Sequence, residues 1–183
     1  MTLSFGVENI MVDHLTKNHR SWNMSRIRSH HTKPEVIVRS LLHRSGYRFK
    51  INDSKLPGCP DIVLPKYKTV IFVHGCFWHR HKNCPKATTP STNKEYWTKK
   101  FRNNVSRDNE VKTELEKLKW RIIIIWECEV TNDPLSVLNE IVCTLEKDVP
   151  KGYSIELDRN KILKLAEERS NYLINRESRN HGK

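Results

Sequence analysis

The chain has 183 residues, enough for one domain with its own hydrophobic core. It carries 33 Lys and Arg against 21 Asp and Glu, and a net charge of +12 favours a polyanionic partner such as nucleic acid over a basic protein with no specific partner. Its apolar runs are too short to cross a bilayer and its first ten residues lack a signal-peptide pattern, so we expect a cytoplasmic protein whose five cysteines are metal ligands or free thiols.

The first predicted elements are helical. Residues 1–20 are polar and irregular, and a short helix is expected over 22–28. Thr32-Lys33-Pro34-Glu35 has the pattern of a capping box with proline in the first turn, and Gly46 would end the helix that follows. The apolar face of this helix consists of Val38, Leu41 and Leu42.

Three strands are then predicted in succession. Residues 47–51 form a candidate first strand, and the Pro- and Gly-rich stretch 56–60 is a turn. Residues 61–64 and 69–73 are predicted to pair antiparallel across the turn at 65–68.

A long polar loop over 82–93 precedes the longest helix, predicted over 94–118. Its apolar stripe contains Trp97, Phe101, Val105, Val111, Leu115 and Leu118. Residues 120–126 include four consecutive isoleucines, which predicts a central strand buried on both faces. Further helices are expected over 134–147 and 158–173.

This order of elements predicts an α/β sandwich around a small mixed sheet. We expect a flexible arm over 1–20, a catalytic or binding domain over 21–150, and a helical extension with a polar tail over 151–183.

The segment from His74 to Cys84 directly follows a predicted strand and is rich in metal-binding residues. Cys76, His81 and Cys84 have the spacing C-x4-H-x2-C, and Cys128 would join them if strand 120–126 paired beside strand 69–73. Such a Cys3His set is typical of structural zinc. His79 could replace His81 on spacing alone, and free thiols with surface histidines are the alternative.

Two carboxylates are candidates for catalysis. Asp61 begins a strand after a Pro-Gly-x-Pro turn, where it could hold Mg²⁺ or simply be a solvated turn residue. Asp108 lies on the apolar stripe of the long helix, so it needs a partner. His79 would form a general-base pair with it, and a salt bridge to Arg102, Arg107 or Lys112 is equally compatible with the pattern.

Other candidates have competing structural roles. Glu35 belongs to the capping box, and a lone histidine such as His74 is more often structural than catalytic. Phe77 and Trp78 are adjacent in a basic loop, where apolar side chains can enter a base stack. Trp97 could instead be a core residue, because it is the first residue of the apolar helix stripe.

Together these residues resemble the very-short-patch repair (Vsr) mismatch endonucleases, and His74-Gly75-Cys76-Phe77-Trp78-His79 is the most specific run. The matching segments are Asn23-Met24, Thr32-Lys33-Pro34-Glu35, Leu56-Pro57-Gly58-x-Pro60-Asp61, Val70-Ile71-Phe72-x-His74-Gly75-Cys76-Phe77-Trp78-His79-x-His81, Asn103-Asn104-Val105-x-Arg107-Asp108 and Trp126-Glu127-Cys128. They keep the family order over residues 22–128, whereas 1–20 and 131–183 lie outside the resemblance.

The resemblance implies a restriction-endonuclease-like fold with structural zinc. It also implies a Mg²⁺-dependent enzyme that nicks duplex DNA 5′ of the thymine in T·G mismatches, which arise when 5-methylcytosine deaminates. A cytosine-5 methyltransferase, mismatch-repair proteins and a DNA polymerase are implied as functional partners. A monomer is expected, because nicking one strand needs one active site.

The resemblance also implies a role for each matching residue. Asp61 and the Val73 backbone carbonyl would bind Mg²⁺, with Glu35 in the outer shell of that metal. His79 and Asp108 would activate water, and His74 would contact the phosphate. Zinc would be held by Cys76, His81, Cys84 and Cys128. Phe77, Trp78 and Trp97 would wedge into DNA from one groove, with Met24 approaching from the other.

Two departures from the family pattern concern the site. Lys82-Asn83 makes the spacing from His81 to Cys84 longer than expected, and Cys59 stands where a basic residue is usual. Two other functions use many of the same features: a non-catalytic zinc-containing DNA-binding module, and a related restriction-type or junction nuclease. The module would not need Asp61, His79 and Asp108 together, so their joint presence favours an enzyme.

Overall fold

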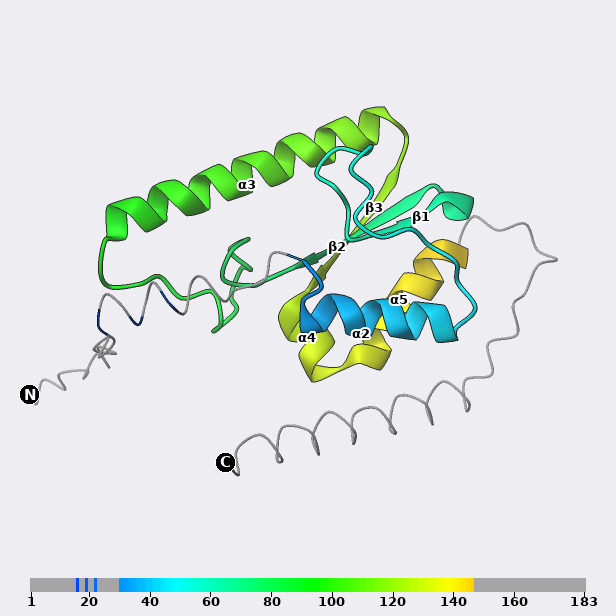
Figure 1. Ribbon diagram of the computed structural model, residues 1–183, viewed down its shortest axis with the longest axis horizontal. Coiled ribbons are helices and arrows are strands. Elements are labelled where there is room, and N and C mark those ends of the chain that lie inside the picture. The colour runs from blue at the N-terminus through cyan, green and yellow to red at the C-terminus, as the bar shows by residue number, and fades with distance from the viewer. Residues whose placement is uncertain (1–15, 17–18, 20–21, 23–29, 147–183) are drawn as a thin grey trace, which may run out of the picture.

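The computed structural model describes residues 16, 19, 22 and 30–146 (Figure 1). Most of the predicted arm, the predicted helix over 22–28 apart from its first residue, and Met24 lie outside the described residues. The same holds for the predicted helix over 158–173 and the tail over 151–183.

Three strands form a mixed sheet in the order β1-β2-β3. Strand β1 (Ile62–Leu64) pairs antiparallel with β2 (Thr69–His74), as predicted, after a short 3-10 helix over Pro65–Tyr67. Strand β3 (Arg121–Trp126) pairs parallel with β2, so the long helix α3 (Lys94–Lys117) is the crossover between them. The α/β class and the small mixed sheet are therefore confirmed.

Two strand predictions are wrong. Strand β3 lies at an edge of the described sheet and not at its centre, and Ile124 is 43% exposed. Four isoleucines in a row indicate β structure, but a strand's place in the sheet depends on pairing with distant segments. Residues 47–51 form no described strand, and only Lys50 pairs there, in a single bridge with Val63.

Helices lie on both faces of the sheet (Figure 1). Helices α2 (Lys33–Arg44), α4 (Glu127–Asn132) and α5 (Pro134–Glu146) share one hydrophobic core with alternate residues of the strands. The sheet residues of this core are Ile62, Leu64, Ile71 and Ile125. The opposite face meets α3 in a smaller core, where Leu115 packs with Val63 and Val70. The period-2 alternation of strand side chains produces this division.

Helix α3 was predicted within one residue of its limits, but its buried stripe differs in part. Val105 and Leu118 are exposed, contrary to prediction. Asn104 is buried in place of Val105, so the inward stripe runs through Phe101, Asn104, Asp108, Val111 and Leu115. Helix α4 was not predicted, because six residues are too few for a helical period to show.

Helix α2 begins and ends as predicted. Glu35 accepts hydrogen bonds from the Thr32 backbone N–H and hydroxyl, and Gly46 follows the helix with φ of 84°. Among the described residues, no helix is both long and apolar enough to cross a membrane.

Candidate active site

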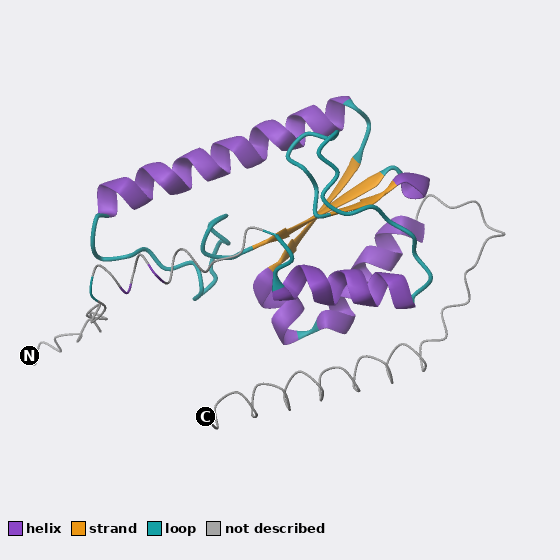
Figure 2. Cartoon of the chain, viewed as in Figure 1, coloured by secondary structure: helices purple, strands orange, loops and turns teal. Residues whose placement is uncertain are grey.

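Strand directions bring the candidate residues together at one end of the strands. The parallel strands β2 and β3 both finish at this end, with His74 opposite Trp126. The antiparallel strand β1 begins at the same end, so Asp61, which directly precedes β1, also lies there. The loop between β2 and α3 leaves the sheet from this end as well (Figure 2). One mixed sheet therefore gathers residues from three distant segments of the chain.

The four predicted zinc donors lie together. One ligand atom from each of Cys76, His81, Cys84 and Cys128 falls within 4.8 Å of all the others. His81 Nδ1 lies 3.6 Å from Cys76 Sγ and 3.3 Å from Cys128 Sγ. Tetrahedral zinc with bonds of about 2.3 Å to sulfur and 2.0–2.1 Å to nitrogen would separate N and S by about 3.6 Å. The donor set and its dimensions fit a zinc ion.

The Cys76 thiol is buried, and its ionisation depends on its surroundings. Burial raises the pKa of the Cys76 thiol to about 12, against the lowering effect of a backbone hydrogen bond from Cys128. A buried thiol of this kind stays protonated at neutral pH, whereas a bound cation would stabilise the thiolate. Cys76 therefore lacks the lowered pKa of a reactive cysteine.

The loop accommodates the longer spacing between His81 and Cys84. Asn83 adopts a left-handed conformation with φ of 60°, which asparagine tolerates well. The Cys84 N–H then donates to the His81 carbonyl at 3.3 Å. Trp126 stacks on the His81 ring at 4.1 Å with an interplanar angle of 4°, which holds the imidazole flat. This contact of Trp126 was not predicted from the sequence, although Trp126 lies only two residues before the predicted zinc donor Cys128.

His79 lies in a second group, with His74 and Asp108. Its Nδ1 atom is 2.6 Å from Asp108 Oδ2, so it does not replace His81 among the thiols. Burial alone would raise the pKa of Asp108, but the hydrogen bond and charge of His79 outweigh it and hold that pKa below its usual value. Of the partners considered for Asp108, the His79 imidazole is the one in hydrogen-bond contact, while Arg107 adds a weaker favourable charge.

His74 is buried beneath His79. The two rings stack with centroids 3.9 Å apart and an interplanar angle of 13°. Burial, then the neighbouring His79 charge, lowers the pKa of His74 to about 4, although Asp108 acts in the opposite direction. His74 is therefore neutral at physiological pH in the DNA-free protein, able to donate one hydrogen bond and accept another.

Asp61 is fixed by the neighbouring strand. Its Oδ2 atom accepts the Val73 backbone N–H at 2.8 Å. Burial raises the pKa of Asp61, the Val73 hydrogen bond lowers it, Glu35 raises it and Arg39 lowers it. Asp61 and Glu35 thus place two acidic groups close together, and a divalent cation would offset their mutual repulsion.

The aromatic side chains form a half-buried cluster at the start of α3. Phe77 makes edge-to-face contacts with Trp78 at 5.0 Å, Trp97 at 5.5 Å and Phe101 at 5.1 Å. Only Phe101 of these four is buried, so Trp97 is not a core residue. Asn104 Nδ2 donates to the Trp78 carbonyl at 3.1 Å and ties the loop to the helix. The cluster leaves aromatic surface exposed beside the histidine pair.

Comparison with known proteins gives the family. The model of the family described as DNA mismatch endonuclease Vsr matches residues 12–86. DNA mismatch endonuclease Vsr of Escherichia coli is 38% identical over 163 residues, which cover 85% of this chain and all of that protein. The chain belongs to the Vsr family. Type II nicking enzyme V.NmeAIP of Neisseria meningitidis is 48% identical over 67% of this chain and 86% of its own length. Type II nicking enzyme V.XorIIP of Xanthomonas oryzae is 43% identical over 67% and 89%.

The Vsr match and the structure complement each other. Residues 12–86 include Asp61, both histidines of the second group and three of the four predicted zinc donors, namely Cys76, His81 and Cys84. Asp108 and Cys128 lie outside residues 12–86; helix α3 carries Asp108, helix α4 carries Cys128, and their contacts with His79 and His81 bring them to the matched part. The site of this Vsr-family protein is therefore assembled from a matched N-terminal part and two later elements.

Proposed function

We propose that this protein is a Mg²⁺-dependent DNA mismatch endonuclease that initiates very-short-patch repair. It nicks duplex DNA on the 5′ side of the thymine in T·G mismatches that arise from 5-methylcytosine deamination. The observation that carries the proposal is the 2.6 Å contact between His79 and Asp108 at the same end of the strands as Asp61, which accepts the Val73 N–H. A DNA-binding module would need no such acid–base pair beside a cation-binding carboxylate.

Asp61 and the Val73 backbone carbonyl would hold Mg²⁺, with Glu35 in its outer shell. Carboxylate and carbonyl oxygens are the donors this ion prefers. When bound, Mg²⁺ would neutralise charge that develops on the phosphate. The Val73 N–H orients the Asp61 carboxylate, and the buried Glu35 adds negative charge beside it.

His79 would accept a proton from the attacking water. Asp108 Oδ2 faces its Nδ1 atom, so Nε2 is the nitrogen that takes the proton. The carboxylate then stabilises the imidazolium and holds the ring in one orientation. His74, neutral and stacked beneath this ring, would donate a hydrogen bond to the scissile phosphate region.

The zinc ion held by Cys76, His81, Cys84 and Cys128 would be structural. Four protein donors leave no position for water. The ion would link the loop after β2 to the start of α4. Because His79 lies in the sequence between the ligands Cys76 and His81, the ion would also restrict the position of His79.

DNA contacts would come from the exposed aromatic surface and from basic side chains. Phe77, Trp78 and Trp97 would enter the base stack at the mismatch, and Met24 would approach from the other groove. The net charge of +12 supports binding to the phosphates.

Several wider features belong to the same proposal. The sheet with helices on both faces is compatible with a restriction-endonuclease-like fold, in a Vsr-like domain over 21–150. A monomer would suffice for a single nick. The functional partners would be a cytosine-5 methyltransferase, mismatch-repair proteins and a DNA polymerase.

A panel of duplexes tests the function. Purified protein is incubated in Mg²⁺ with otherwise identical matched, T·G-mismatched and branched duplexes, each labelled on either strand. Nicking only of the T·G duplex, only on the thymine strand and 5′ of that thymine, is expected. Cleavage of the matched duplex or the junction would favour a restriction-type or junction nuclease, and tight binding without nicking would favour the DNA-binding module.

A further inference from the structure

Arg39 is a buried cation close to the site for which the function above assigns no role. It lies on the inner face of α2 and is only 9% exposed. A buried guanidinium is costly unless its donors and charge are matched. Its partners therefore indicate what the charge is for.

The guanidinium joins three segments of the chain. Arg39 Nη2 lies 2.7 Å from Glu35 Oε2 in its own helix, 3.2 Å from Asn52 Oδ1 and 3.2 Å from the backbone carbonyl of Asp61. Arg39 Nη1 lies 3.0 Å from His31 Nδ1. The same side chain thus contacts the backbone of one proposed Mg²⁺ ligand and the carboxylate proposed for its outer shell.

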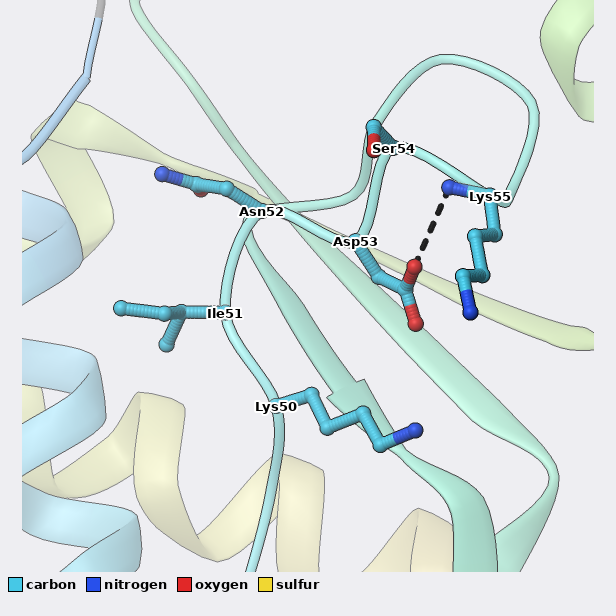
Figure 3. Close-up of a pocket in the computed structure, with 6 residues that line it drawn as sticks. All are labelled: Lys50, Ile51, Asn52, Asp53, Ser54 and Lys55. Carbon is cyan, nitrogen blue, oxygen red and sulfur yellow. Dashed lines mark hydrogen bonds between the residues drawn. The ribbon is translucent and has the colours of Figure 1, made fainter.

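Asn52 is shaped for this contact. The loop over 50–55 borders a shallow hollow, and Asn52 is turned to the opposite side of the loop from Lys50 and Asp53 (Figure 3). Asn52 has φ of 47°, a left-handed conformation that asparagine tolerates and most other residues avoid. Asn52 therefore supplies both the left-handed turn of this loop and the amide oxygen that accepts from Arg39.

Arginine suits this position better than lysine. Its planar group can reach acceptors from a helix, a loop and a strand start at the same time, whereas an ammonium is a single point of charge. Its fixed positive charge also lies beside two carboxylates that would otherwise repel each other, Glu35 and Asp61.

We propose that Arg39 is a positioning residue that places the Asp61 backbone and the Glu35 carboxylate for the divalent cation. This inference rests on the proposed function for the identity of the metal ligands. Arg39 itself touches neither DNA nor metal in this role. Its removal should weaken cation binding while leaving the cation-free DNA complex unchanged.

The test measures metal binding directly as well as nicking. Mn²⁺ binding to the full chain, in complex with T·G duplex whose scissile phosphate is replaced by a non-hydrolysable analogue, is followed by electron paramagnetic resonance. The variants are Arg39→Met, Arg39→Lys and Asn52→Gly, with Asp61→Asn to define the site. Arg44→Met is the control, because it removes an exposed positive charge from the same helix.

Arg39→Met should raise the Mn²⁺ dissociation constant, and the Mg²⁺ concentration for half-maximal nicking, by at least about tenfold, the effect of losing charged hydrogen bonds. Arg39→Lys should recover part of this loss. Asn52→Gly should shift both values less in the same direction, because glycine accepts the positive φ while the amide is lost. Arg44→Met should leave both values at the wild-type level, and a purely structural role would lower thermal stability without moving them.

A folded Arg39→Met protein with wild-type Mn²⁺ affinity would overturn the inference while the proposed function stands. If Arg39→Met does not fold, an unchanged Mn²⁺ affinity in Asn52→Gly overturns it instead. Wild-type protein without Asp61-dependent Mn²⁺ binding would overturn both. Normal Mn²⁺ binding without T·G nicking would contradict only the proposed function, and Arg39 would still be judged from the Mn²⁺ titration.

Discussion

The hydrogen bond between His79 Nδ1 and Asp108 Oδ2 joins residues 29 positions apart and defines the proposed general base. His79→Ala should slow single-turnover nicking by about 10²–10⁴-fold, the usual contribution of a general base. Asp108→Asn is nearly isosteric but removes the charge that stabilises the imidazolium, so its loss should be similar.

The double variant His79→Ala/Asp108→Asn should be no slower than the worse single variant, since residues that act as a unit are not additive. Single-turnover rates in saturating Mg²⁺ measure this. Fully multiplicative losses would show that the two residues act independently, and the pair would have to be abandoned.

Cys84 is the donor whose removal best tests the zinc proposal. Cys84→Ser should lose stoichiometric zinc and unfold at lower temperature, because binding of structural zinc contributes directly to folding free energy. Cys143→Ser is the matched control, since Cys143 is exposed and lies outside the metal group. Elemental analysis that found no zinc in the wild-type protein would rule the proposal out.

Side chains differ in how far sequence patterns reveal them. The four predicted zinc donors could be found from the sequence because parallel pairing of β2 and β3 brings the ends of these two strands together. Arg39 was missed, although Glu35, Val38, Arg39 and Leu42 share one helical face and two charges on that face are a signal. Which groups satisfy those charges depends on Asn52 and Asp61, and no local pattern gives such distant contacts.

The turn before β1 packs directly on α3, and this contact links the element that carries Asp61 to the one that carries Asp108. A Cβ atom at Gly58 would lie 2.5 Å from Val111 Cγ1, where no side chain fits without movement. Gly58 also has φ of 71°, which disfavours alanine. The two elements are therefore fixed against each other through a glycine.

Gly58→Ala should lower the free energy of unfolding by about 1–3 kcal/mol from overpacking, beyond the backbone effect. Gly46→Ala is the control, because Gly46 has φ of 84° but open space around it. Denaturant unfolding of both variants gives the difference. Equal destabilisation would mean that only backbone strain matters and that the Gly58 contact with α3 is unimportant.

Helices were predicted better than strand positions. Helix α3 is a long periodic segment, and its limits follow from local pattern alone. The place of β3 at the sheet edge and the single bridge at Lys50 result from long-range pairing. Val105 is exposed and Asn104 takes the inward position, where it donates to the Trp78 carbonyl, a polar contact that an apolar pattern does not show.

Phe77 and Trp78 are the proposed wedge that enters the DNA base stack. Removing Phe77 and Trp78 together, as Phe77→Ala/Trp78→Ala, should weaken binding to T·G duplex far more than to matched duplex. Unstacking is easiest at a mispaired base, so the wedge contributes most there. Affinities for both duplexes are measured at one salt concentration. Equal losses on the two duplexes would count against the wedge.

Asp61 is proposed to hold the cation that this protein needs to nick DNA at a T·G mismatch. The direct measurement is single-turnover nicking of a T·G duplex in Mg²⁺ by wild-type and Asp61→Ala proteins, with duplex binding measured for both in the absence of divalent cation. Wild-type protein should nick 5′ of the thymine, and Asp61→Ala should bind the duplex with similar affinity but not nick it. Nicking by Asp61→Ala at the wild-type rate, or no Mg²⁺-dependent nicking by the wild type, would contradict the claim.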